Sequence, residues 1–260
     1  MVNRSGCGAG SGVEDQAVGL VYDSTVRAVL CSASETLSER LHGLLLRWAC
    51  RECVVLTVEH TDHLASPLLG GAQLLILDMD SVELPEQDQL AKEHLGLIVI
   101  SRDVGRAIRS YRWHPAAFLK PDFDLRRLSE ALSACEKYWH CGRLCLESPY
   151  KRRAFRLPLG RIRYVEAAAH YCLFNQGRQS VRFRFSVNEL EGLLPTPPFV
   201  RCHRSYLVHL DAVAGMSYTA VTLRGSASLP LGRTYINTLR AALEAWQGGQ
   251  RPNDDLHFAL

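Results

Sequence analysis

The sequence predicts an α/β, doubly wound, parallel five-stranded sheet, followed by a β-rich domain with short helices. Three observations support this. Short apolar runs alternate with helical patterns through the first half of the chain, this alternation stops near residue 150, and the balance of charge changes sign at the same place. A length of 260 residues also agrees with two domains rather than one.

The first half alternates buried-strand patterns with amphipathic helices. The expected strands are residues 26–31, 53–58, 73–78, 95–100 and 116–120. The expected helices begin at Ser34, near 60, near 86, at Asp103 and at Asp124, the last one running to about His140. Because each strand is followed by a helix, we expect a parallel sheet whose functional groups gather at the carboxyl ends of the strands.

Three of these strands end in polar residues: Asp78 closes the third, Ser101 the fourth and Lys120 the fifth. In this respect residues 26–138 resemble the receiver domains of two-component response regulators. The resemblance implies that Asp78 is the phospho-acceptor, that Ser101 and Lys120 stabilise the added phosphoryl oxygens, and that a sensor kinase is a partner.

One part of the receiver pattern is missing. Receivers hold Mg²⁺ with an acidic pair after the first strand, and here that position reads Cys31, Ser32, Ala33, Ser34. Since Mg²⁺ requires carboxylate oxygens, we expect neither this ion nor another cofactor or metal. Two interpretations of Asp78 stay open: a phospho-acceptor, or a residue of a receiver fold kept for dimerisation or ligand sensing. The missing pair favours a phosphorylation-independent or atypical receiver.

The second half of the chain is basic. Residues 1–147 contain 15 Lys and Arg against 20 Asp and Glu, whereas residues 148–260 contain 15 against 7, and 14 of those 15 cations are Arg. The guanidinium fork donates two parallel hydrogen bonds to phosphates or base edges. The composition therefore indicates a polyanionic partner, with a basic surface that merely confers solubility as the alternative.

Elements of the second half are short and mostly extended. We expect two strands around Pro158–Gly160, a hairpin over 171–185, and strands near 205–209, 212–217, 219–224 and 227–230. Ser186 and Glu189 form a capping-box pattern that begins a short helix. A last helix runs from about Thr234 to Gly248.

This order resembles the LytTR DNA-binding domain over about residues 150–246. The resemblance depends on segments 161–174, 185–195, 199–213 and 229–243, the most specific being FVRCHRSYLVHLDAV. It implies contacts to bases or phosphates from His170, Tyr171, Arg204 and Arg233, and a contact to the DNA backbone from Arg201. At Ala169-His170 the sequence departs from the family, which often has Gly-Asn there.

We therefore expect a sequence-specific regulator that binds double-stranded DNA as a homodimer, is not an enzyme, and acts in the cytoplasm. No apolar run is long enough to span a membrane, and no secretory signal is evident. The expected boundaries are a tail at 1–24, a receiver-like domain at 25–141, a linker at 142–150, a DNA-binding domain at 151–247 and a tail at 248–260.

Two alternative functions remain. The basic half could be a protein- or RNA-interaction module, or the cysteines could serve a thiol-based enzyme or redox sensor. Cys50 and Cys53 form a Cys-x-x-Cys, and Cys202 lies within the FVRCHRSY segment. The nine cysteines are more simply explained as reduced, buried thiols.

Overall fold

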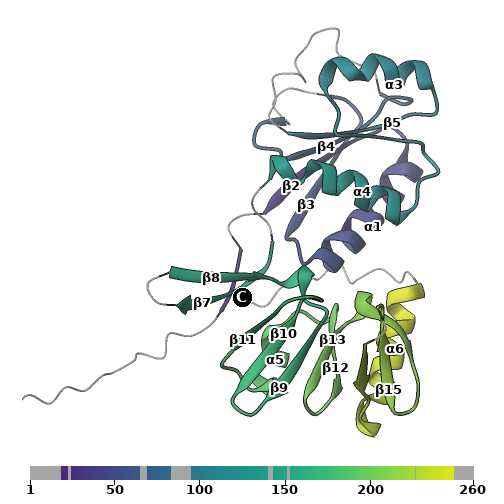
Figure 1. The fold of residues 1–260 in the computed structure, drawn as a ribbon. Helices are drawn as coiled ribbons and strands as arrows, with labels where there is room; N and C mark the ends of the chain where they lie inside the picture. The colour runs from purple at the N-terminus through teal and green to yellow at the C-terminus, as the bar shows by residue number, and fades with distance from the viewer. Residues whose placement is uncertain are drawn as a thin grey trace, which may run out of the picture.

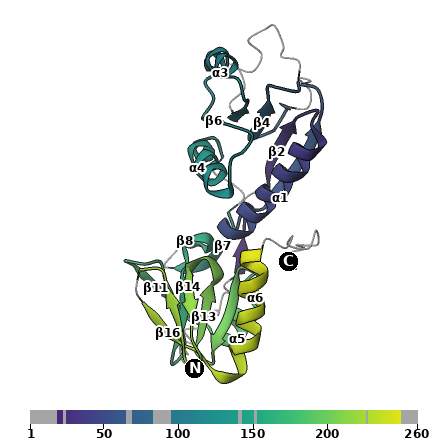
Figure 2. The same ribbon diagram turned by 90° about the vertical axis from the view of Figure 1, so that its right-hand side faces the viewer.

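The computed structural model describes residues 19–22, 25–64, 69–82, 95–139, 143–150, 153–225 and 227–248. None of the helices in these ranges is long and apolar enough to cross a membrane. The described residues form a parallel α/β domain and a β-rich domain, shown from two sides in Figures 1 and 2.

The N-terminal domain contains a five-stranded parallel sheet with the order β3-β2-β4-β5-β6. Its strands are β2 (Val26–Cys31), β3 (Leu56–Thr61), β4 (Leu74–Asp78), β5 (Gly96–Ile100) and β6 (Ala117–Leu119). β2 pairs in parallel with both β3 and β4, so the chain winds outward in two directions from β2. The predicted doubly wound sheet is confirmed.

Three described helices cover this sheet: α1 (Glu35–Glu52), α3 (Val104–Ser110) and α4 (Leu125–Cys135). The side chains of Ser34, Asp103 and Asp124 accept backbone N–H bonds at their N-termini. Apolar residues of α1 and α4 pack on one face of the sheet, and a second apolar cluster covers the other. α4 is shorter than expected, because the chain continues as a 3-10 turn at Glu136–Tyr138.

The predicted second strand was misplaced by three residues. α1 continues to Glu52, and Cys53 ends it in the left-handed conformation with φ of 51°, so β3 begins only at Leu56. It runs to Thr61, where a helix had been expected to begin. Residues 62–64, which fall in that expected helix, are not helical, and residues 65–68 lie outside the described residues, as does the whole of the helix expected at 86–94.

A small antiparallel sheet lies between the two domains, with the order β1-β7-β8. Its strands are β1 (Gly19–Val21), β7 (Cys145–Tyr150) and β8 (Arg153–Pro158). The tail and the linker expected from the sequence therefore contain paired strands. The reason is hydrophobic burial: Leu146 is fully buried, and Leu20 packs against the same cluster.

The C-terminal domain is built on two antiparallel sheets, ordered β11-β10-β9-β13-β12 and β14-β15-β16. Their strands are β9 (Tyr164–Ala168), β10 (Tyr171–Asn175), β11 (Ser180–Phe183), β12 (Phe199–His203), β13 (Tyr206–His209), β14 (Val213–Met216), β15 (Ala220–Leu223) and β16 (Ser228–Pro230). The helices are α5 (Val187–Leu193) and α6 (Ile236–Gly248). The predicted β-rich domain with short helices is confirmed, including the capping box of Ser186 and Glu189.

Candidate nucleic-acid interface

Two tight turns lie together at one end of the five-stranded sheet. β9 pairs with β10 through Ala168 and Tyr171, and with β13 through Glu166 and Tyr206. Both partners are antiparallel to β9, so the Ala169-His170 turn and the turn that precedes Tyr206 meet at the end of β9. The Ala167 N–H donates to the Ser205 carbonyl oxygen at 2.8 Å, which ties the two turns together.

The segment that carries Arg233 joins the same end. Arg233 begins a 3-10 turn, Arg233–Tyr235, immediately before α6. The preceding Gly232 donates its N–H to the Cys202 carbonyl oxygen on β12 at 2.9 Å. We call the site formed by His170, Tyr171, Arg204 and Arg233 the turn end; Figure 1 shows this end of the domain pointing away from the parallel sheet.

The turn end presents unpaired polar side chains to solvent. The side chains of His170, Arg204 and Arg233 are exposed and form no hydrogen bond or ion pair with any residue that the structure describes. Tyr171 is 42% exposed, and the Arg182 guanidinium lies 5.2 Å from its ring centroid. These donors and ring faces can reach a polyanion without first giving up an internal partner.

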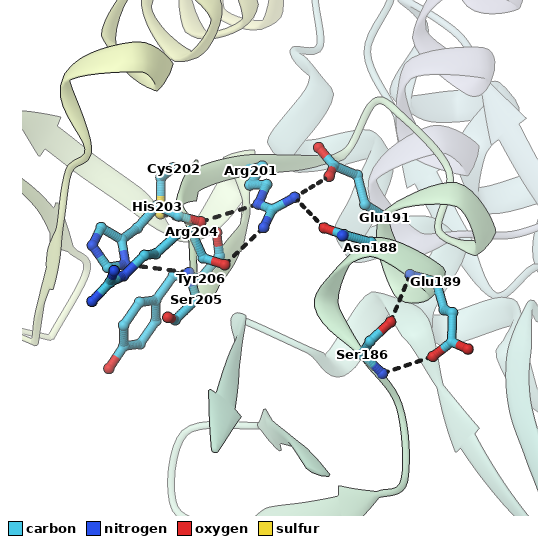
Figure 3. Close-up of polar contacts among 10 residues, drawn as sticks. All are labelled: Ser186, Asn188, Glu189, Glu191, Arg201, Cys202, His203, Arg204, Ser205 and Tyr206. Atoms are coloured by element: carbon cyan, nitrogen blue, oxygen red, sulfur yellow. Dashed lines mark hydrogen bonds and ion pairs between the residues drawn. The ribbon is translucent and has the colours of Figure 1, made fainter. Parts of the chain in front are cut away.

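Arg201 differs from the other candidates. Only 15% of its side chain is exposed, and its guanidinium is hydrogen-bonded to side chains of α5 and to carbonyl oxygens of the turn that follows β12 (Figure 3). The sequence suggested the residue as a DNA contact but did not predict these partners. The only indication of these partners in the sequence was the spacing of Asn188 and Glu191, i and i+3, which places them on one face of a short helix.

In the N-terminal domain, Asp78 is enclosed. It is 3% exposed, and its Oδ2 accepts hydrogen bonds from the Ser32 and Ser81 hydroxyls at 2.7 and 2.6 Å. Its Oδ1 accepts from the Asp80 N–H at 3.0 Å. The carboxylate is therefore satisfied by neutral donors, two of which are serine hydroxyls that the sequence did not single out.

Neither of the other two receiver-like residues forms a hydrogen bond or ion pair with the Asp78 side chain within the described part of the chain. Ser101 donates its hydroxyl to Asp80 Oδ1 at 2.6 Å, and the Lys120 side chain is exposed. Burial raises the pKa of Asp80, but hydrogen bonds from Ser101 and the Arg102 N–H outweigh it, so the net pKa lies below its usual value.

The residues around Asp78 do not fit Mg²⁺. A hard divalent cation needs several free oxygen ligands. Ser32 stands after β2 where receivers have an acidic residue, and the oxygens of Asp78 and Asp80 already accept protein hydrogen bonds. Within the described ranges, no group of three or more His, Cys, Asp or Glu side chains is arranged to hold a metal ion.

A contact between the two domains was not predicted from the sequence. The Arg51 Nε, in the last turn of α1, donates to Asp211 Oδ2 at 2.7 Å, and Trp246 of α6 donates to Asp211 Oδ1 at 3.1 Å. His209, only 4% exposed, bonds the Arg51 carbonyl oxygen at 3.1 Å. We call these four residues the interdomain contact.

The backbones at the interdomain contact approach closely. A Cβ added at Gly160 would lie 2.4 Å from the Glu52 carbonyl oxygen, so only glycine fits there. Cys53, the residue after α1, packs into the core of the C-terminal domain with Leu144 and Leu159. Because the partners are about a hundred residues or more apart, no local pattern in the sequence could have indicated them.

Six described cysteines are free thiols in buried positions: Cys31, Cys50, Cys53, Cys135, Cys172 and Cys202. Burial raises the pKa of Cys50 and of Cys202 to about 12, and it also raises that of Cys53. Only the thiolate is a strong nucleophile or metal ligand. These environments therefore suit small core side chains and disfavour the thiol-based alternative.

The fold and the turn end together define a class of protein. A receiver-like domain is joined to a β-rich domain that presents arginines at one end, which is the organisation of a DNA-binding response regulator. The comparison with family models agrees: residues 152–244 match the LytTr DNA-binding domain. The chain therefore carries a LytTR DNA-binding domain behind a receiver-like domain, and the predicted resemblance is confirmed.

Solved structures similar to each domain share low sequence identity with the chain. The LytTr domain of a putative methyl-accepting/DNA response regulator from Bacillus cereus is 21% identical, with 38% of this chain and 95% of that chain covered and a TM-score of 0.34. A receiver domain protein from Clostridium thermocellum is 16% identical, with 43% and 94% covered and a TM-score of 0.35. A receiver domain from Pseudomonas fluorescens is 19% identical, with 44% and 98% covered and a TM-score of 0.36. No curated protein matched the chain.

Proposed function

We propose that the chain is a sequence-specific, double-stranded DNA-binding transcriptional regulator that contacts DNA through the turn end. The observation that carries this proposal is the convergence of exposed, unpaired His170, Arg204 and Arg233 at one end of a basic domain. Arg204 and Arg233 supply the bidentate donors that suit guanine O6 and N7, while His170 and Tyr171 donate to base edges or phosphates.

The test is a fluorescence titration of the full-length protein with a promoter duplex and a scrambled duplex at two salt concentrations. We expect Arg233→Ala to lose about 1–3 kcal/mol of the preference for the promoter duplex. Arg161→Ala is the matched control, because Arg161 is also an exposed arginine of this domain but lies next to Gly160, far from the turn end.

Failure of the wild type to bind either duplex at low salt would refute the proposal. Single-stranded RNA in the same titration then tests the RNA-binding form of the alternative, a protein- or RNA-interaction module. DNA binding has a further signature, because log K falls with log salt by roughly 0.9 for each phosphate neutralised.

The receiver-like domain is proposed to work without phosphorylation of Asp78, as a regulator rather than an enzyme, and without Mg²⁺. Burial of Asp78 and the two serine hydroxyls on its Oδ2 support this. Incubation with acetyl phosphate and Mg²⁺ should leave the intact mass unchanged. A phosphorylated species that disappears in Asp78→Asn would overturn this part of the proposal and restore a role for a sensor kinase.

The regulator is further proposed to act in the cytoplasm and to bind DNA as a homodimer. The free thiols of the described residues suit a reducing compartment. Two copies would bring two turn ends onto spaced repeats of the operator. Light scattering of the protein free and on DNA tests the stoichiometry, and a monomer in both states would contradict the dimer.

A further inference from the structure

Arg201 of β12 has its guanidinium almost completely occupied within the protein. Its Nη1 donates to Asn188 Oδ1 at 2.8 Å and to Glu191 Oε2 at 2.7 Å. Its Nη2 donates to the Arg204 carbonyl oxygen at 2.7 Å, and its Nε to the His203 carbonyl oxygen at 3.2 Å. Figure 3 shows the fork between α5 and the turn that carries Arg204.

These bonds leave little capacity for a phosphate. A guanidinium has five N–H donors, and four of them are accounted for by the contacts above. Two parallel donors are needed for bidentate recognition of a phosphate or a guanine, and only one remains. Glu191 also compensates the positive charge, so Arg201 presents less charge to a polyanion than Arg204 or Arg233 does.

The same guanidinium reaches the segment that carries Arg233. Its Cζ lies 5.6 Å from the ring centroid of Tyr235, two residues after Arg233. A Cβ added at Gly232 would lie 2.9 Å from the Tyr235 ring and 3.6 Å from the His203 ring, so this segment packs tightly against β12. Arg201 thus contacts both parts of the turn end that bear an exposed arginine.

The acceptors of Arg201 on α5 are themselves held in place. The Ser186 hydroxyl accepts from the Glu189 N–H at 3.2 Å, and the Glu189 carboxylate accepts from the Ser186 N–H at 2.8 Å. This capping box fixes the first turn of α5, which includes Asn188. On the other side of the fork, the Ser205 N–H donates to His203 Nδ1 at 3.2 Å and closes the turn.

From this geometry we infer that Arg201 is a positioning residue that determines specificity: it fixes Arg204 and Arg233 relative to each other through α5, and it does not itself bind DNA. This inference rests on the proposed function of the turn end. The four hydrogen bonds and the Tyr235 contact make the two arginines a single preorganised pair. Preorganisation lowers the entropy that binding must remove, and so it increases the preference for the correct sequence.

Glu191→Gln in the full-length protein separates a positioning role from a direct DNA contact. If Arg201 bound a phosphate, removing the nearby acid would free its charge and tighten binding to every duplex. If Arg201 positions the turn end, the same change loosens the fork, and the preference for promoter over scrambled duplex falls by about tenfold, a part of what one bidentate base contact supplies. A direct contact therefore predicts higher affinity for both duplexes, whereas a positioning role predicts a lower preference for the promoter duplex.

Arg201→Lys is the second variant, because it keeps the charge and loses the planar fork. We expect a similar loss of preference, an unchanged salt dependence, and faster amide exchange at Arg204, Ser205 and Tyr206. The inference would be overturned if the slope of log K against log salt in Arg201→Gln fell by the amount expected for about one phosphate contact. It would also be overturned if Glu191→Gln and Arg201→Lys both kept the wild-type preference for the promoter duplex.

Amide exchange also keeps this inference separate from the proposed function. If the wild type binds no duplex, the proposed function fails, yet faster exchange of the turn in Arg201→Lys would still establish the positioning contact. If the wild type binds and Arg233→Ala loses its preference while exchange and preference in Arg201→Lys are normal, only the inference about Arg201 fails.

Discussion

The two ends of the C-terminal domain are built in opposite ways. At the interdomain contact, Arg51, His209, Asp211 and Trp246 bond one another, and Gly160 lies against the backbone of α1. At the turn end, Arg204 and Arg233 are exposed and unpaired among the described residues. One end is therefore expected to contribute stability, and the other affinity for a partner.

α6 connects these ends. It begins directly after the Arg233–Tyr235 turn, and near its other end Trp246 bonds Asp211. With 13 residues it is about 20 Å long. Its buried Leu239 and Leu243 fix it in the core of the domain. α6 is therefore a rigid element that can transmit a change in the contact between α1 and Asp211 to Arg233.

The largest effect is expected from Gly160→Ala. The new Cβ would lie 2.4 Å from the Glu52 carbonyl oxygen, so the backbone of α1 or of the 160 region must move. We expect a loss of about 3 kcal/mol in the free energy of unfolding, measured with urea, as for an overpacked core. Gly192→Ala is the control, because a Cβ there meets nothing within 4 Å. Equal stability of the two variants would refute the close approach.

A smaller loss is expected when Arg51 is replaced by Ala. Among the side chains that the structure describes, Trp246 is then the one remaining donor to Asp211, and we expect about 2 kcal/mol less stability, the usual value for a charged hydrogen bond. Arg126→Ala removes an exposed ion pair with Glu130 and should cost less than about 1 kcal/mol. A double-mutant cycle of Arg51→Ala with Asp211→Ala that shows no coupling would contradict the pairing.

The burial of His209 at the interdomain contact is expected to make the stability of the protein depend on pH. Burial lowers the pKa of His209, and its Nδ1 accepts the Asp211 N–H at 3.2 Å, which requires the unprotonated ring nitrogen. As pH falls below the ordinary value of 6.5, the unfolded chain takes up a proton that the folded protein resists, so stability is lost on acidification.

The measurement is urea unfolding of wild type and His209→Gln between pH 7.5 and pH 5. The stability of the wild type should fall more steeply over this range than that of the variant. Taking the difference between the two proteins removes the contribution of His60, whose pKa is also lowered by burial. Parallel curves would mean that His209 does not couple folding to pH.

The sequence predicted the structure correctly where the relevant residues are close together in the chain. Apolar runs placed β4 and β5 to within a residue, and the spacing of Ser186 and Glu189 predicted the cap of α5. The polar ends of the strands likewise located Asp78, which lies at the carboxyl edge as expected.

Sequence reasoning failed where a structure depends on partners far apart in the chain. Gly19–Val21 becomes a strand only because it pairs with residues 145–147, and Arg51 finds Asp211 only once both domains are folded. Arg201 was recognised as a candidate from its motif, but its occupancy by Asn188 and Glu191 depends on how α5 packs against β12. Tertiary contacts of this kind produce no periodic pattern of residues in the sequence.

The smallest effect concerns the turn where the sequence departs from the family pattern. Ala169 has φ of 55°, in the left-handed region that costs a residue with a Cβ roughly 1–2 kcal/mol. Ala169→Gly removes that strain but adds entropy to the unfolded chain, so we expect a net gain of about 0.5 kcal/mol. Ala168→Gly, in the adjacent strand, should instead lower stability. Because neither change touches the His170 side chain, the affinity for DNA should stay the same in both, and a loss of stability in Ala169→Gly would show that the turn is not strained.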